Sequence, residues 1–143
     1  MPDTRTTKLP RRIAENVAMG ALIAGARVLL PRTKVQTLVR MSERTAKTLA
    51  VVTPFHARGD TLARGRELAY RWSRRVHGSH CLHRALATRV WLAAYRIDSR
   101  IVLGFRKREA FEGHAWLEVP LDDAATLIFV ADEDGYAVAI DSR

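Results

Sequence analysis

Apolar residues recur at helical spacing through the first two thirds of the chain and then alternate with polar residues. A period near 3.6 residues is typical of a helix with one buried face, and a period of 2 is typical of a strand. The first pattern predicts helices at residues 13–30, 34–52, 61–75 and 80–95. The second predicts strands at residues 100–105, 113–119, 126–131 and 136–140. Helices followed by strands indicate an α+β domain with an antiparallel sheet.

Local signals mark the ends of these helices. Pro31 ends the first and Pro54 the second, because proline lacks a backbone donor and clashes with the preceding turn. Thr33 and Ser79 are the expected N-caps of the second and fourth helices. Residues 1–12 are expected to form a mobile arm. The expected buried stripe of the second helix is Val35, Leu38, Met41, Thr45 and Leu49.

With 143 residues, of which 48% are hydrophobic, the chain is long enough for one domain with a substantial core. A single cysteine cannot form an internal disulfide, and no stretch has the pattern of a secretory signal. A cytoplasmic setting is therefore expected. The most apolar run, Val17–Leu30, is short for a membrane span and contains Arg27. We expect this run to be buried or docked on a partner, with contact to an anionic membrane as the less favoured alternative.

The net charge of +9 is concentrated in the first half of the chain. Residues 1–80 carry sixteen Lys and Arg against five Asp and Glu, whereas residues 81–143 carry eight against ten. A basic half suits an acidic partner, which could be a nucleic acid, a membrane or an acidic peptide. The alternative is that the arginines only solvate the outer faces of helices.

Cys81 and His114 are the candidate pair for chemistry. Cys81 falls in the first turn of the fourth predicted helix, where unpaired amides favour a thiolate and can bind an oxyanion. His114 begins the alternating run of the second strand and could exchange protons with a substrate. Papain-like and transglutaminase-like folds assemble a nucleophile and its base in this order. Taken alone, each residue is more often a buried packing residue.

His77, His80 and His83 lie close to Cys81 in the sequence. Zinc sites commonly use paired spacings such as Cys-x-x-Cys, and no second pair occurs here. A metal site is therefore not expected, and no cofactor is expected either.

Three blocks of the sequence resemble the transglutaminase-like leader peptidases of lasso peptide biosynthesis. The family pattern is a Cys-Leu pair at a helix start, an apolar strand that ends in Gly and basic residues, and a His-Ala-Trp-hydrophobic-Glu strand. The chain matches all three in order and at similar separations, over about residues 75–119. The matching blocks are His80–Ala87, Ile97–Lys107 and Phe111–Val119.

The resemblance implies a transglutaminase-like/papain-like core with a Cys-His-Asp triad in which Cys81 and His114 match position for position. The acid does not match position for position, because the family usually turns through Asp-Gly after the His strand and this chain has no glycine there. If Val119 pairs with Thr126, counting outward sets His114 roughly opposite Asp132. Asp132 is therefore the expected acid. The alternatives for the acid are Asp122, Asp123 and Asp134.

The resemblance also implies a function, a domain division and partners. The expected activity is that of a cysteine protease that removes the leader from a lasso precursor through an acyl-enzyme on Cys81. Residues 1–75 would form an N-terminal arm and basic helical region, and residues 76–143 the catalytic core, together as one compact unit. The implied partners are the precursor (leader) peptide, a small leader-recognition protein and the ATP-dependent lasso cyclase.

Two other functions remain open on the sequence. A transglutaminase-like fold can pass its acyl group to an amine instead of water. A basic nucleic-acid-binding module would also explain the charge, but the chain lacks a recognised nucleic-acid motif, so nucleic acid is not an expected partner. Trp116 and Glu118 share a strand face with His114 and either border the site or only pack against it.

Overall fold

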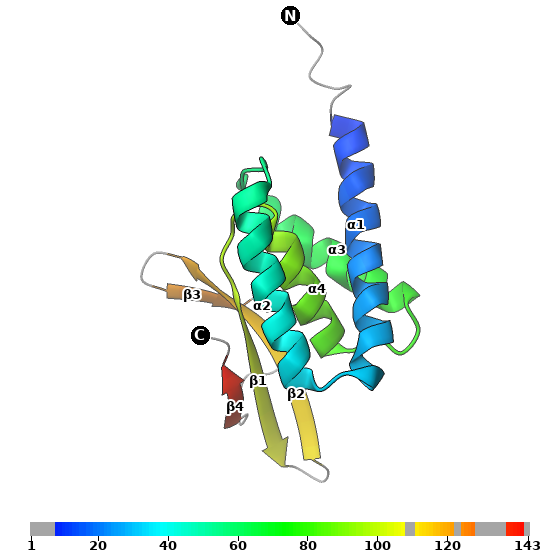
Figure 1. Cartoon of the computed structure of the whole chain (residues 1–143), viewed down its shortest axis with the longest axis vertical. Helices are drawn as coiled ribbons and strands as arrows, with labels where there is room; N and C mark the ends of the chain where they lie inside the picture. Colours follow the sequence, from blue (N-terminus) through cyan, green and yellow to red (C-terminus); the bar gives the residue numbers. More distant parts are fainter. Residues whose placement is uncertain (1–7, 108–110, 122–123, 128–136, 142–143) are drawn as a thin grey trace, which may run out of the picture.

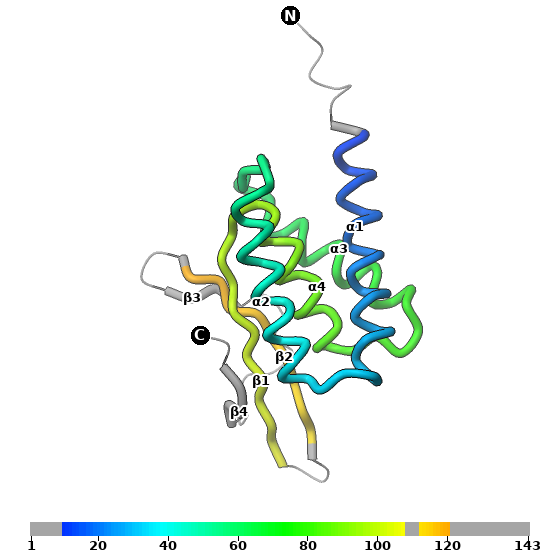
Figure 2. Tube along the Cα trace, viewed as in Figure 1, coloured from blue at the N-terminus to red at the C-terminus, as the bar shows by residue number. Residues whose placement is uncertain are grey.

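The computed structural model of the chain describes residues 8–107, 111–121, 124–127 and 137–141. Helices pack together against an antiparallel sheet, which confirms the α+β class predicted from the sequence (Figures 1 and 2). The helical elements are α1 (Lys8–Leu29), the 3₁₀ turn η1 (Leu30–Arg32), α2 (Val35–Val52), α3 (Thr61–Arg75) and α4 (Cys81–Ala93). The strands are β1 (Arg100–Lys107), β2 (Phe111–Leu121), β3 (Ala124–Leu127) and β4 (Ala137–Asp141).

The sheet has the strand order β3-β2-β1-β4, and all its neighbours are antiparallel. In the β1–β2 pair, Gly104 lies opposite His114 and Arg100 opposite Glu118. In the β2–β3 pair, Val119 lies opposite Thr126, as predicted from the sequence. The register therefore places His114 in the middle of a two-stranded ladder rather than at a loop.

Helix α4 is the centre of the molecule. It contacts α1, α2 and α3 on one side and the sheet on the other (Figure 1). Thr88 and Leu92 on this helix are fully buried, and the strand residues Ile101 and Leu117 are also fully buried. Burying a large aliphatic side chain stabilises the fold by about 1.5–3 kcal/mol. The helical region and the sheet therefore share one continuous core.

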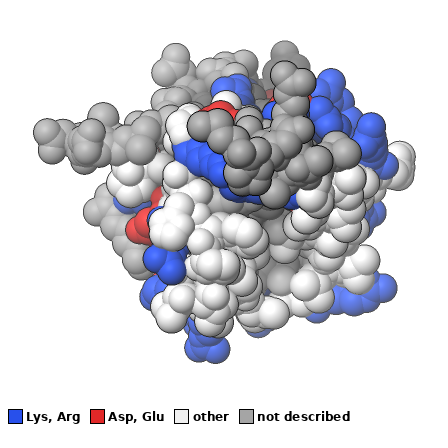
Figure 3. All heavy atoms as spheres, turned by 90° about the horizontal axis from the view of Figure 1, so that it is seen from above, with Lys and Arg blue, Asp and Glu red and all other residues white. Residues whose placement is uncertain are grey.

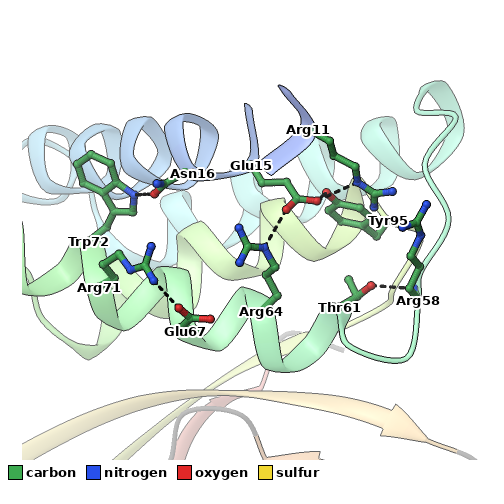
Figure 4. A network of polar contacts seen from close by, with 10 residues as sticks. All are labelled: Arg11, Glu15, Asn16, Arg58, Thr61, Arg64, Glu67, Arg71, Trp72 and Tyr95. Carbon is green, nitrogen blue, oxygen red and sulfur yellow. Dashed lines mark hydrogen bonds and ion pairs between the residues drawn. The ribbon is translucent and has the colours of Figure 1, made fainter. Parts of the chain in front are cut away.

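A half-buried carboxylate joins α1 to α3 and to the segment that follows α4. Glu15 of α1 accepts hydrogen bonds from the Tyr95 hydroxyl at 2.6 Å, from Arg11 Nε at 3.0 Å and from Arg64 Nε at 3.0 Å (Figure 4). Burial alone would raise the pKa of Glu15, but these three donors outweigh burial and lower it. Burial and the bond to Glu15 together raise the pKa of Tyr95 to about 12. This network fixes the N-terminal half of α1 to α3 and to Tyr95, two residues after the end of α4.

Several local predictions are wrong. The first helix begins at Lys8 instead of residue 13, since Pro10 lies within its first turn, where a proline is tolerated. Lys34, not Thr33, is the N-cap residue of α2. On α2 the buried residues are Leu38, Val39 and Ser42, whereas Met41 and Thr45 are exposed. Ser42 is tolerated inside because its hydroxyl donates to the Val39 carbonyl at 2.7 Å.

Two glycines of α1 provide a matched test of this packing. A Cβ at Gly20 would lie 2.7 Å from the Trp72 ring of α3, whereas a Cβ at Gly25 would meet nothing within 4 Å. We expect Gly20→Ala to lower the free energy of unfolding by about 1–3 kcal/mol through overpacking. Gly25→Ala should raise it by up to about 1 kcal/mol through helix propensity. Urea unfolding measures both, and equal effects would contradict the close α1–α3 contact.

Candidate active site

Cys81 is the first residue of α4. The preceding residue, His80, is the N-cap with an extended backbone, and its N–H donates to His83 Nδ1 at 2.8 Å. The sequence predicts Ser79 as the N-cap, which is wrong, because Ser79 lies one residue too early. The buried Oγ of Ser79 has no hydrogen-bond partner in the part of the chain that the structure describes. A histidine thus takes the place that Glu or Gln usually holds at the third position of a capped helix.

Helix α1 holds the turn that leads into Cys81. Arg27 Nε donates to the His77 carbonyl at 3.2 Å. The next residue, Gly78, has a φ of 73°, which a side chain rarely adopts. A Cβ at Gly78 would also lie 2.9 Å from the Arg27 guanidinium. The approach to the thiol is therefore fixed by backbone conformation and by a side chain fifty residues earlier.

The thiol of Cys81 lies against strand β2. The backbone N–H of Ala115 donates to Cys81 Sγ, with 3.4 Å between nitrogen and sulfur. The amide nitrogen of Ala115 is bonded to the carbonyl carbon of His114, so covalent geometry puts Sγ within about 6 Å of the His114 Cα. The sulfur is therefore an acceptor for a backbone donor of β2. This contact places Cys81 near the backbone of His114, its predicted partner.

His114 is half-buried and its ring is oriented by neighbours on its own strand face. The Trp116 ring stacks on the imidazole with 6.1 Å between centroids and 24° between planes. Trp116 Nε1 donates to Glu118 Oε1 at 3.3 Å, and Arg100 Nε donates to Glu118 Oε2 at 2.6 Å. Trp116 and Glu118 therefore do more than cover the sheet: they connect the imidazole to an ion pair with β1.

The proposed acid of the triad is not placed. Asp132 and the alternatives Asp122, Asp123 and Asp134 lie outside the described residues. The described β2–β3 register ends at the pair Glu118–Leu127 and does not reach His114. Asp132 remains a prediction.

His83, two residues after Cys81 in α4, is a buried histidine. Its exposed fraction is 4%, and burial lowers its pKa, with the nearby positive charges of His80 and Arg27 acting in the same direction. Since Nδ1 accepts the His80 N–H, the neutral ring carries its proton on Nε2. That Nε2 has no partner among the residues that the structure describes. His83 therefore serves the helix start as a neutral acceptor.

Three contributors to this arrangement were not found from the sequence. The Arg100–Glu118 pair could have been found by counting the β1–β2 register outward from the hairpin. The hydrogen bond from the Ala115 amide gave no sequence signal, because every residue except proline has a backbone N–H. Arg27 gave none because it contacts a residue fifty positions later in the chain. Within the described ranges, no three His, Cys, Asp or Glu residues cluster closely enough to hold a metal ion.

These contacts suit nucleophilic chemistry at sulfur. A thiolate at a helix N-terminus is stabilised by the helix dipole, and a hydrogen bond from an amide adds to this. Cys81 is only partly buried, so the sulfur is not sealed from solvent. A thiolate can attack a carbonyl and pass the acyl group on, with a histidine as the usual proton carrier.

The family profile described as the transglutaminase-like superfamily matches residues 26–139 of the chain. No curated protein and no solved structure matched the chain. The profile match includes α2, α3 and α4, the strands β1 to β3, part of β4, and both Cys81 and His114.

The buried neutral His83 predicts how stability depends on pH. As pH falls through about 6.5, the unfolded chain takes up a proton at this residue and the folded chain does not, because the folded pKa is lower. The free energy of unfolding should therefore fall between pH 7.5 and pH 5.5. His83→Gln retains an acceptor but cannot titrate, so its unfolding should vary less over this range. His77→Gln, at an exposed site, is the matched control; equal pH profiles for all three proteins would contradict the prediction.

Proposed function

The chain belongs to the transglutaminase-like superfamily, and from this membership we propose that it is a cysteine peptidase that removes the leader from a lasso peptide precursor. The superfamily includes cysteine-protease-like enzymes, which supports acyl transfer at sulfur as the class of reaction. The lasso substrate is proposed from the resemblance of the three blocks around Cys81, Gly104 and His114. The observation that carries the proposal is the contact of Cys81 Sγ with the amide next to His114.

In the proposed reaction, the thiolate of Cys81 attacks the carbonyl carbon of the last leader residue. The negative charge that develops on the carbonyl oxygen is stabilised by first-turn amides of α4, which have no acceptor within the helix. His114 then donates a proton to the departing amine of the core peptide. The bond between carbon and nitrogen breaks, and the leader stays attached to sulfur as a thioester.

Water completes the cycle in this proposal. His114, now neutral, accepts a proton from a water molecule that attacks the thioester, and the leader leaves with a free carboxylate. Trp116 and Glu118 keep the imidazole oriented in both steps, through the stacking and the bond to Arg100. An aspartate, proposed to be Asp132, would stabilise the imidazolium.

The proposed partners are the precursor (leader) peptide, a small leader-recognition protein and the ATP-dependent cyclase that receives the freed amine. Support comes from the basic first half of the chain, which suits acidic partners. A separate recognition protein would bring the scissile bond close to the thiol and so raise its effective concentration.

The state of the thiol can be tested without knowing the substrate. Iodoacetamide labels Cys81 alone, because it is the only cysteine. If the His114 imidazole takes up the proton of Cys81, the wild-type protein should be alkylated faster at neutral pH than His114→Gln, because the thiolate is the reacting form. Mass spectrometry over a range of pH gives the alkylation profile of each protein.

His80→Gln is the matched control, because His80 is exposed and contacts the same helix start. Its profile should stay close to that of the wild type. If His114→Gln and the wild type have the same profile, the imidazole does not act on the sulfur and the proposal fails.

The substrate is tested by cleavage of a lasso precursor together with its recognition protein. We expect the wild type to release the leader, and Cys81→Ala to reduce the rate by at least about 10³-fold. His114→Ala should cost about 10²–10⁴-fold, since it removes proton transfer. Mass spectrometry gives the products; added alkylamine distinguishes hydrolysis from transfer to an amine. Cleavage at an unchanged rate by Cys81→Ala would refute an acyl-enzyme on this residue.

A further inference from the structure

Helices α1 and α2 leave an apolar groove between them. Both pack on α4, on either side of it, and they are joined at one end by η1 (Figure 1). The groove is a hollow of about 220 Å³ with α4 as its floor. Its lining includes Leu22, Gly25 and Leu29 of α1, Leu38 and Met41 of α2, and Leu86 of α4. It contains neither Cys81 nor His114.

The outer face of α1 extends this apolar surface. Ile13, Val17 and Val28 are more than half exposed, and the only charged residues between them, Glu15 and Arg27, are bonded to other parts of the fold. The segment Pro10–Arg32 is long and apolar enough to cross a membrane, and only 22% of its apolar window is buried; core helices of soluble proteins pass the same test of length and composition. Exposed apolar surface of this extent marks a site of interaction.

The charges around the groove favour an acidic occupant. Residues 10–53 carry eight Lys and Arg and two Glu. Both carboxylates are already in ion pairs, Glu15 with Arg11 and Arg64, and Glu43 with Lys47. On α2, Arg44 lies between the groove residues Met41 and Thr45 in sequence and is exposed. In the space-filling view, uncharged side chains cover much of the lower half, with Lys and Arg at its margins (Figure 3).

We propose that this groove binds an amphipathic helix of a partner protein, with an apolar ridge and acidic flanks. A helix laid between α1 and α2 would pack its ridge on α4 and complete a bundle, which is a common mode of peptide recognition. The concave shape suits a rod better than the flat surface of a bilayer. A second copy of the chain is disfavoured because each copy carries a net charge of +9. The inference is independent of the chemistry at Cys81.

The test uses a fluorescent synthetic helix of about 18 residues, with leucine at every third or fourth position and glutamate on the flanks. Fluorescence anisotropy should show it binding at least tenfold more tightly than a scrambled peptide of the same composition. Gly25→Phe should weaken binding at least tenfold, because its side chain enters open space in the groove. Gly59→Phe, at another glycine with open space around it, should bind within twofold of the wild type.

Three outcomes would overturn the proposal. Equal binding by Gly25→Phe and the wild type would place the peptide elsewhere. Stronger binding to anionic lipid vesicles than to the peptide, lost in Gly25→Phe, would assign the surface to a membrane. Dimerisation in sedimentation experiments that Gly25→Phe abolishes would assign it to a second copy. Unchanged alkylation of Cys81 in Gly25→Phe shows that the fold and the site are intact, so failure here is distinct from failure of the proposed peptidase.

Discussion

The position of Cys81 depends on the burial of one helix. Helix α4 is enclosed by three helices and by the sheet, so it can neither rotate nor slide without exposing side chains such as Thr88 and Leu92. Interiors are packed as densely as organic crystals, and a small shift of such a helix is costly. The thiol at its first residue is therefore held against the Ala115 amide by the whole core. The site needs no strong local bond, because the core fixes its geometry.

Helix α1 stabilises this arrangement at two places. In its first half, Glu15 joins it to α3 and to Tyr95 (Figure 4). Near its end, Arg27 binds the turn before Cys81. Both charged side chains of its apolar segment are thus used for internal contacts. Because no other charged residue lies between Ile13 and Val28, the exposed face of this stretch stays apolar. The same residues that fix the site therefore leave a surface suited to a partner.

Helix bounds and strand pairs could be predicted from the sequence where one strong local signal decided their position. The bounds of α3 at Thr61–Arg75 and the Val119–Thr126 pairing were predicted correctly. The buried face of α2 was not, because Met41 fits a core as well as a surface and Ser42 reaches the inside only through a bond to its own helix. The helix start at Cys81 was placed one residue off, since histidine is not a usual capping residue. The triad acid lies outside the described residues and stays a prediction.

The two proposals meet on α4. Leu86 and Val90, which line the groove, follow Cys81 by five and nine residues, so they lie about 7–14 Å along the helix axis from it. An extended chain covers about 3.3–3.6 Å per residue, so a linker of about five residues would join a helix in the groove to a bond at the thiol. Tethering at such a distance raises the effective concentration of substrate without any new contact at the sulfur. The proposed peptidase would then take its selectivity from the groove, while the sulfur and imidazole supply only the chemistry.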